Sequence, residues 1–353
     1  MSLNLSNRGL TTLQGIDFPN DLQELDCSHN RLTSLEYCPK NLRKLWCDDN
    51  IISSLRYCPE NLQELICGQN RLSSLQYCPR NLRKLGCWEN QLTSLQYCPE
   101  NLQELICSQN QISSLQYCPQ SLIILVCGNN QLTSLQYCPD SVQELTCNCN
   151  QITSLQYCPN SLITLHCWSN QLASLYYCPP NIQHLWCDGN RLTSLNHCPK
   201  NLRKLWCGHN LLTSLQYCPE SVTLLNCGFN RLTSLQYCPK NLEILFCNNN
   251  QLRTLQDCPN NLLKLYHDNN PLSIEYLNKN LQQIKIINQL KIKRLKHGIE
   301  MIESLIYNQK ARMIQRCWDQ YWYKPNEQGI SRHALRGIRI MEQDGISIID
   351  TPN

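Results

Sequence analysis

The residues whose chemistry stands out in this sequence are its 26 cysteines. The stretch LQYCPENLQELICSQN, residues 95–110, contains Cys98 and Cys107, and a close variant of it returns every twenty residues. Thiols at regular spacing could form disulfides, bind a metal ion, act as nucleophiles or fill an apolar core. Which of these they do depends on the elements that position them.

Those elements form a repeat. When the first leucine of NLQEL is position 2 of a twenty-residue unit, position 5 is leucine thirteen times, from Leu25 to Leu265. Position 10 is asparagine thirteen times, from Asn30 to Asn270, position 7 is cysteine twelve times, and positions 18 and 19 are Cys-Pro twelve times. Positions 5 and 7 alternate with the variable positions 4, 6 and 8, which predicts a short strand with one buried face. One strand per unit predicts a parallel sheet in a solenoid.

The resulting pattern, L-x-x-L-x-C-x-x-N-x-L, resembles the leucine-rich repeat superfamily over about residues 3–272. The twenty-residue unit is similar to the short repeats of bacterial effector proteins, and the Cys-Pro variant is similar to repeat proteins of giant DNA viruses. The resemblance implies an α/β horseshoe with a parallel β-sheet on its concave side. Because Cys-Pro favours extended backbone, we expect a thin, mostly non-helical convex side. We expect the position-10 asparagines to form a buried hydrogen-bonded ladder.

The repeat predicts three segments. Residues 1–21 read as a degenerate capping repeat, 22–272 as the solenoid, and 273–353 as a basic, mainly helical cap or tail with 13 Lys/Arg and 8 Asp/Glu. One or two helices there could cover the last strand, because solenoids need capped ends. The apolar residues spaced as on a helix face are Ile284, Ile287, Leu290, Leu295, Ile299, Ile302 and Ile306.

The cysteines are interpreted first as packing. Position 7 falls where related repeats place an inward leucine, and a free thiol behaves as a small hydrophobe. Equivalent side chains on adjacent coils run parallel, which is poor geometry for disulfides. A zinc site needs four convergent ligands, whereas the cysteine spacings alternate between 11 and 9 apart from the extra Cys149. We therefore expect no metal and no cofactor.

Variable side chains on the concave face are the candidates for binding. Five of the seven tryptophans fall at positions 4, 6, 8, 9 or 11, where side chains should face solvent. Tryptophan is the residue most enriched in binding hot spots. The predicted partner-binding residues are Trp46, Trp88, His166, Trp168, His184, Trp186, Lys204, Trp206, Phe246 and Tyr266. The alternative is aromatic stacking along the sheet without a partner.

Two other rows are interpreted as structural. Position 4 alternates Glu24, Lys44, Glu64, Lys84 and Glu104, and opposite charges on neighbouring strands can pair. Position 17 is tyrosine in ten units, and the regularity of this convex row predicts stacking.

The tail offers weaker signals. ARMIQRCWDQYW resembles an IQ-type calmodulin-binding segment through Ile314 and Gln315 but departs from it at Asp319. Basic residues near 285–296 are typical of a solvated helix face, and an anionic partner is the alternative. Cys317 is a lone candidate thiol for a ligase-like activity.

These observations predict a non-enzymatic protein–protein interaction scaffold whose concave face binds a protein, centred on Trp168, Trp186 and Trp206. Residues 1–272 carry 18 basic and 19 acidic residues, so no nucleic acid is expected on the repeats. The rivals are a ubiquitin-ligase-like adaptor or effector acting through the tail, and a purely structural virion or scaffold protein. With no signal peptide or spanning segment in the sequence, we expect an intracellular protein, in the cytoplasm and possibly of a host cell.

Overall fold

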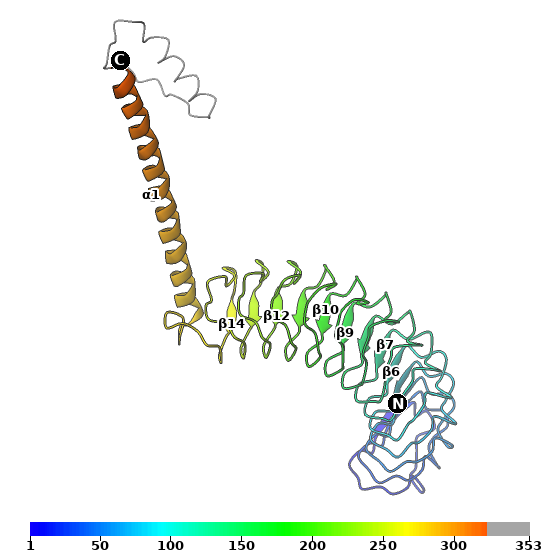
Figure 1. Cartoon of the computed structure of the whole chain (residues 1–353). Helices are drawn as coiled ribbons and strands as arrows, with labels where there is room; N and C mark the ends of the chain where they lie inside the picture. The colour runs from blue at the N-terminus through cyan, green and yellow to red at the C-terminus, as the bar shows by residue number, and fades with distance from the viewer. Residues whose placement is uncertain (323–353) are drawn as a thin grey trace. The chain divides into compact units, whose positions relative to one another are not determined.

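The computed structural model describes residues 1–322, with side chains through Met313. The chain divides into two compact units, Met1–Lys285 and Ile286–Asn353. The first unit is a solenoid in which successive strands begin twenty residues apart from the second strand onward (Figure 1).

The described part of the solenoid contains one parallel sheet of fourteen strands, and each strand pairs with its neighbours in sequence. Leucine at position 5 lies at the centre of each three-residue strand from β2 onward, in register from one strand to the next. The parallel sheet predicted from the repeat is confirmed. The strands are β1 (Ser2–Asn4), β2 (Glu24–Asp26), β3 (Lys44–Trp46), β4 (Glu64–Ile66), β5 (Lys84–Gly86), β6 (Glu104–Ile106), β7 (Ile124–Val126), β8 (Glu144–Thr146), β9 (Thr164–His166), β10 (His184–Trp186), β11 (Lys204–Trp206), β12 (Leu224–Asn226), β13 (Ile244–Phe246) and β14 (Lys264–Tyr266).

The core is a set of parallel side-chain columns. The unit that contains β7 contributes Leu122, Leu125, Cys127, Leu132 and Leu135, all of them 0% exposed. Neighbouring units place the same residue types at the same positions, so each column continues through the solenoid. A single unit could not bury these side chains by itself, which makes the stack one cooperative structure.

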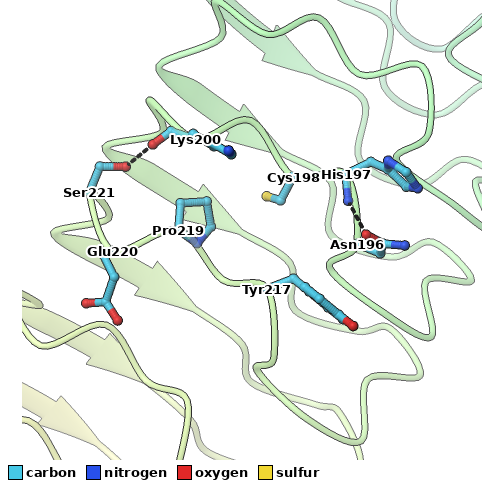
Figure 2. A pocket seen from close by; sticks show the side chains of 8 residues that line it. All are labelled: Asn196, His197, Cys198, Lys200, Tyr217, Pro219, Glu220 and Ser221. Carbon is cyan, nitrogen blue, oxygen red and sulfur yellow. Dashed lines mark hydrogen bonds between the residues drawn. The ribbon is translucent and has the colours of Figure 1, made fainter.

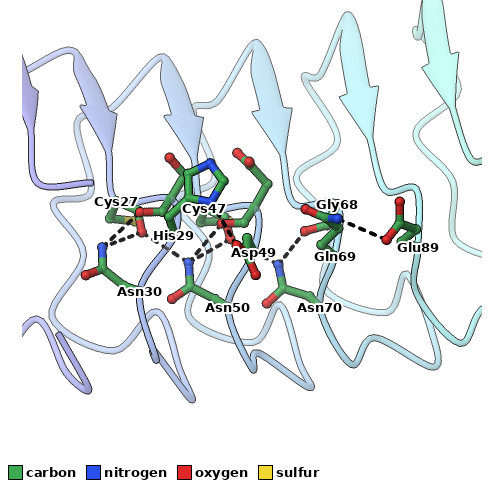
Figure 3. Close-up of polar contacts among 12 residues, drawn as sticks. Cys27, His29, Asn30, Cys47, Asp49, Asn50, Gly68, Gln69, Asn70 and Glu89 are labelled. Atoms are coloured by element: carbon green, nitrogen blue, oxygen red, sulfur yellow. Dashed lines mark hydrogen bonds and ion pairs between the residues drawn. The ribbon is translucent and has the colours of Figure 1, made fainter. Parts of the chain in front are cut away.

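The predicted asparagine ladder is present along the strand ends. The Asn130 amide nitrogen donates to the backbone oxygens of Cys107, Cys127 and Gly128 at 3.0, 3.1 and 3.2 Å. Its side-chain oxygen accepts from the backbone nitrogen of Ile112 at 2.9 Å. Figure 3 shows the same arrangement repeating at Asn30, Asn50 and Asn70. Each asparagine therefore satisfies backbone groups of two units where the chain turns away from the sheet.

The return path to the next strand consists of turns, as expected for a thin convex side. The backbone nitrogen of Cys118 donates to Leu115 at 2.9 Å, which closes the turn before the proline. Tyr117 inside this turn has a φ of 68° and lies 55% exposed. Left-handed backbone is rare for bulky residues, so these turns are held by the units around them.

The expected stacking of the position-17 tyrosines is wrong. Among the position-17 tyrosines that the structure describes, the ring contact with another tyrosine is that of Tyr177 with Tyr176, which belongs to the same unit. The left-handed turn directs the rings outward, so successive units present separate, half-exposed tyrosines.

The solenoid is closed at its carboxyl end by the segment that follows β14. Tyr276 and Ile284 are both 0% exposed, and the Lys285 ammonium donates to the backbone oxygen of Leu262 at 2.8 Å. Ile284 and Lys285 belong to the first turns of α1 (Leu281–Trp322), a single helix of 42 residues.

Most of the apolar residues that the sequence places on one helix face of the tail are exposed on α1. Leu290, Leu295, Ile299, Ile302 and Ile306 are 50–60% exposed. A helical spacing predicts an apolar face but does not say whether anything covers that face.

Candidate functional site

The side of the sheet that faces solvent, called the concave face here, presents positions 4 and 6 of every unit. These are the first and third residues of each strand, and the buried leucine lies between them. From β9 to β14 this face and the adjoining strand ends carry the aromatic zone, which we define as His166, Trp168, His184, Trp186, Lys204, Trp206, Phe246 and Tyr266. Six strands about 4.8 Å apart give the zone a length of roughly 24 Å.

One stack in the aromatic zone joins β9 and β10. The His166 ring lies flat on the Trp186 indole, with centroids 4.0 Å apart and planes 7° from parallel. His184 lies on the same strand as Trp186, with ring centroids 6.2 Å apart. Burial lowers the pKa of both histidines, and the charge of Lys204 lowers that of His184 further. The stack is therefore neutral and apolar at neutral pH.

A second stack covers the carboxyl-terminal strands. Phe246 and Tyr266 stack with centroids 4.4 Å apart and planes 2° from parallel. Trp206 approaches Phe246 at 6.0 Å across the intervening β12, whose Asn226 is smaller than the aromatic rings on either side. Trp186 and Trp206 are register partners on the adjacent strands β10 and β11. The Trp186 ring stacks on His166 of β9, and the Trp206 ring contacts Phe246 of β13, so the two indoles contact rings on opposite sides.

Trp168 belongs to a different row at the ends of the strands, where it is 36% exposed. Farther along these strand ends, His209 and Phe229 stack with centroids 4.0 Å apart, and Phe229 is 46% exposed. The concave face and its edge therefore both present aromatic surface from β9 onward.

Trp46 and Trp88 lie apart from the aromatic zone, on and beside β3 and β5. Trp46 neighbours Lys44, whose ammonium is 6.0 Å from the indole centroid. Lys44 also pairs with Glu24 at 2.9 Å, and Lys84 pairs with Glu104 at 3.2 Å, which confirms the pairing expected at position 4 for these residues.

The Trp88 indole fills the space left by two missing side chains. An added Cβ at Gly68 would collide with the Trp88 ring, and one at Gly86 would lie 2.5 Å from Trp88 Cζ3 and 2.9 Å from Ile66 Cδ1. Trp88 is consequently half-buried and covers the backbone of two neighbouring units. These contacts pack the Trp88 indole against the sheet.

Gly68→Ala is expected to displace the Trp88 indole and to lower the free energy of unfolding by about 1–3 kcal/mol, because overpacking a filled site forces rearrangement. Urea denaturation measures this loss. Gly298→Ala is the control, since an added Cβ there has no atom within 4 Å. Equal stability of Gly68→Ala and the parent protein would contradict the packing role of Trp88.

Asp188 is a residue of this face that sequence reasoning missed. Its carboxylate accepts a hydrogen bond from the backbone nitrogen of Gly208 at 3.0 Å, next to the aromatic zone. Desolvation raises its pKa from 3.8 to about 6, although the hydrogen bond from Gly208 opposes the change. The available signal was the glycine at position 8 of the next unit, which leaves room for the carboxylate.

Asp188→Asn is expected to raise the free energy of unfolding at pH 7.5 by about 1–3 kcal/mol, since the native carboxyl binds its proton more tightly than the unfolded one. The parent protein should lose this stability as the pH rises from about 4 to about 6, and the variant should not. Chemical denaturation at pH 4 and pH 7.5 compares the two. Equal pH dependence in both proteins would contradict the raised pKa.

The cysteines of the solenoid line its interior. Position-7 thiols such as Cys107 are 0% exposed, and position-18 thiols such as Cys118 are 5% exposed. Burial raises the pKa of Cys107 and that of Cys178 to about 12. Protonated, buried thiols are poor nucleophiles and poor metal ligands. Among the residues with described side chains, no three His, Cys, Asp or Glu are grouped so as to hold a metal ion.

A groove on the convex side brings a cysteine and a histidine that are adjacent in sequence to the surface (Figure 2). Its lining includes His197, Cys198 and Tyr217, and Figure 2 shows the Cys198 sulfur and the His197 ring pointing to opposite sides. Burial raises the pKa of Cys198 well above its usual range. The groove therefore lacks the activated thiolate that a Cys–His nucleophile requires.

The chain is similar to solved structures in its fold, although the sequence comparisons find no match. No family model matches the sequence, and no curated protein does. Among solved structures, a leucine-rich effector protein of Yersinia pestis, YopM, matches with a TM-score of 0.63 and 24% identity, over 76% of this chain and 88% of that one. A leucine-rich repeat protein of Leptospira interrogans matches with a TM-score of 0.62 and 26% identity, over 77% and 79%. This chain has the leucine-rich repeat fold.

YopM of Yersinia enterocolitica matches with a TM-score of 0.54 and 28% identity, over 77% of this chain and 74% of that one. Leucine-rich repeat folds are generally protein–protein interaction scaffolds. The structure contains no helix, within the residues it describes, that is long and apolar enough to cross a membrane. The residues singled out at 314–319, including Cys317, lie outside the described side chains.

Proposed function

We propose that this leucine-rich repeat protein is a non-enzymatic interaction scaffold whose aromatic zone binds a protein partner. The observation that carries the proposal is the pair of aromatic clusters, His166–Trp186 and Trp206–Phe246–Tyr266, on the solvent side of the sheet from β9 to β14. Contiguous apolar surface of this kind usually marks an interaction site.

The composition of the zone favours a protein over a nucleic acid. Its basic residue is Lys204, its histidines are neutral at neutral pH, and Asp188 next to it carries a carboxylate. Nucleic-acid faces need clustered positive charge along the phosphate backbone. A neutral aromatic surface with a few polar groups matches the buried centre and polar rim of a protein interface.

The two stacks also suggest how the energy of binding is distributed. Trp186 and Trp206 are already ordered by ring contacts, so their immobilisation costs little when the partner binds. Ordered tryptophans of this kind are typical hot spots. Trp168 would extend the contact toward the strand ends.

Affinity capture tests the proposal. The intact protein and the triple variant Trp168→Ala/Trp186→Ala/Trp206→Ala are used as baits, and circular dichroism confirms that both are folded. A matched control, Tyr97→Ala/Tyr117→Ala/Tyr137→Ala, removes three half-exposed rings from the convex side. Partners that the control retains and the triple variant loses support the proposal. Recovery of the same partners by all three baits would refute it.

A further inference from the structure

The long helix α1 has an apolar seam that the proposed function does not use. From Asn288 to Met313, positions separated alternately by four and three residues follow a heptad register. The a positions are Ile292, Ile299, Ile306 and Met313, and the d positions are Asn288, Leu295, Ile302 and Gln309. A heptad repeat with apolar a and d positions is the pattern of a coiled coil.

The centre of this seam is exposed along the described helix. Ile292, Leu295, Ile299, Ile302 and Ile306 are 48–60% exposed, on a helix that continues without interruption from Leu281 to Trp322. The contact between His297 and Glu300, at 3.9 Å, lies at f and b positions away from the seam. Apolar side chains at five successive a and d positions are the interface that a second helix of the same register would cover.

We propose that α1 pairs with α1 of a second copy as an antiparallel two-stranded coiled coil. With its centre between Ile299 and Ile302, this pairing places Ile299 against Ile302 of the second copy and Leu295 against Ile306. Four consecutive layers of the core are then entirely aliphatic. Gln309 meets Ile292 at the two flanking layers.

The charges beside the seam select the antiparallel orientation. The e positions carry Lys296 and Glu303. In an antiparallel pair e faces e, so Lys296 lies beside Glu303 of the second copy, and this contact occurs twice. In a parallel pair e faces g of the other helix, which sets Lys296 beside Lys291 instead. In both orientations two pairs of basic residues lie next to each other across the helix interface. Only the antiparallel orientation also forms two pairs of opposite charge, Lys296 with Glu303 of the second copy.

Sedimentation equilibrium on the full chain tests the pairing. We expect a species of twice the 41.1 kDa chain mass that dissociates on dilution. Ile299→Lys/Ile302→Lys places four charges in the central layers and should weaken dimerisation by about a hundredfold or more. The matched control Met301→Lys/Tyr307→Lys adds the same charges at exposed c and b positions and should leave the dimer intact.

Charge reversal at the e position tests the orientation. Lys296→Glu sets like charges together twice in the antiparallel pair and should weaken dimerisation by about threefold to tenfold, and adding Glu303→Lys should restore it. In a parallel pair Lys296→Glu would face Lys291 and strengthen the dimer. A monomer at about 0.1 mM, a dimer that survives the seam substitutions, or tighter association of Lys296→Glu would each overturn the proposal.

Discussion

Raising the pH from 8 to 10 in the presence of a reductant is expected to unfold the solenoid without denaturant. Burial raises the pKa of the thiols at positions 7 and 18, for example to about 12 at Cys38 and Cys107, whereas an unfolded thiol titrates near 9. Above that value the unfolded chain releases protons that the native chain keeps, so stability falls as the pH rises. At pH 10 each buried thiol should lower the free energy of unfolding by more than about 1 kcal/mol. The thiols at positions 7 and 18 together should lower it by more than a typical stability of 5–15 kcal/mol.

The measurement is circular dichroism against pH, with urea denaturation at each pH below the transition. A variant with Cys87→Ala, Cys107→Ala and Cys127→Ala should show a shallower fall, because three thiols no longer ionise in the unfolded chain. Gln131→Ala, which changes an exposed side chain and removes no thiol, should leave the slope unchanged. A solenoid that is equally stable at pH 8 and pH 10 would contradict the interior position of the thiols.

Replacing Asn130 by alanine is expected to lower the free energy of unfolding by about 3–5 kcal/mol, the second large effect. The substitution removes three donated hydrogen bonds and one accepted hydrogen bond. The buried N–H of Ile112 loses its acceptor. The carbonyls of Cys107 and Cys127 each lose one of two amide donors and keep the bond from Asn110 or Asn150. Urea denaturation at pH 7.5 measures the change.

Gln131→Ala is the matched control for Asn130→Ala. Gln131 is the next residue, its side chain is exposed, and its backbone hydrogen bond to Ile112 survives the substitution. We expect a change within about 0.5 kcal/mol. Asn130→Asp, which keeps an acceptor and loses the donors, should be as damaging as alanine. A loss below 1 kcal/mol for Asn130→Ala would show that the ladder is dispensable.

The repeat allowed the sheet, the asparagine ladder and the inward cysteines to be predicted because each depends on a position within one unit. Leu125 is buried and Asn130 turns the chain for reasons that every unit shares. The period of two along the strand and the proline after position 18 therefore define most of the fold.

The features that the sequence could not define depend on differences between units. Trp88 and Trp186 both belong to the variable positions, yet Trp88 covers Gly68 and Gly86 whereas Trp186 stacks on His166. The raised pKa of Asp188 likewise depends on the absent side chain of Gly208. Such contacts connect neighbouring units, and periodicity within one unit carries no information about them.

The most direct test of the binding face compares two tryptophans on the same side of the sheet. With a partner recovered by affinity capture, isothermal titration calorimetry gives the dissociation constants for the intact protein, Trp186→Ala and Trp88→Ala. Because Trp186→Ala removes a hot-spot tryptophan, it should raise the dissociation constant by about thirtyfold or more. Trp88→Ala should change the dissociation constant by less than about threefold. Equal affinities for the intact protein and Trp186→Ala, or a larger loss with Trp88→Ala, would contradict the assignment of binding to the aromatic zone.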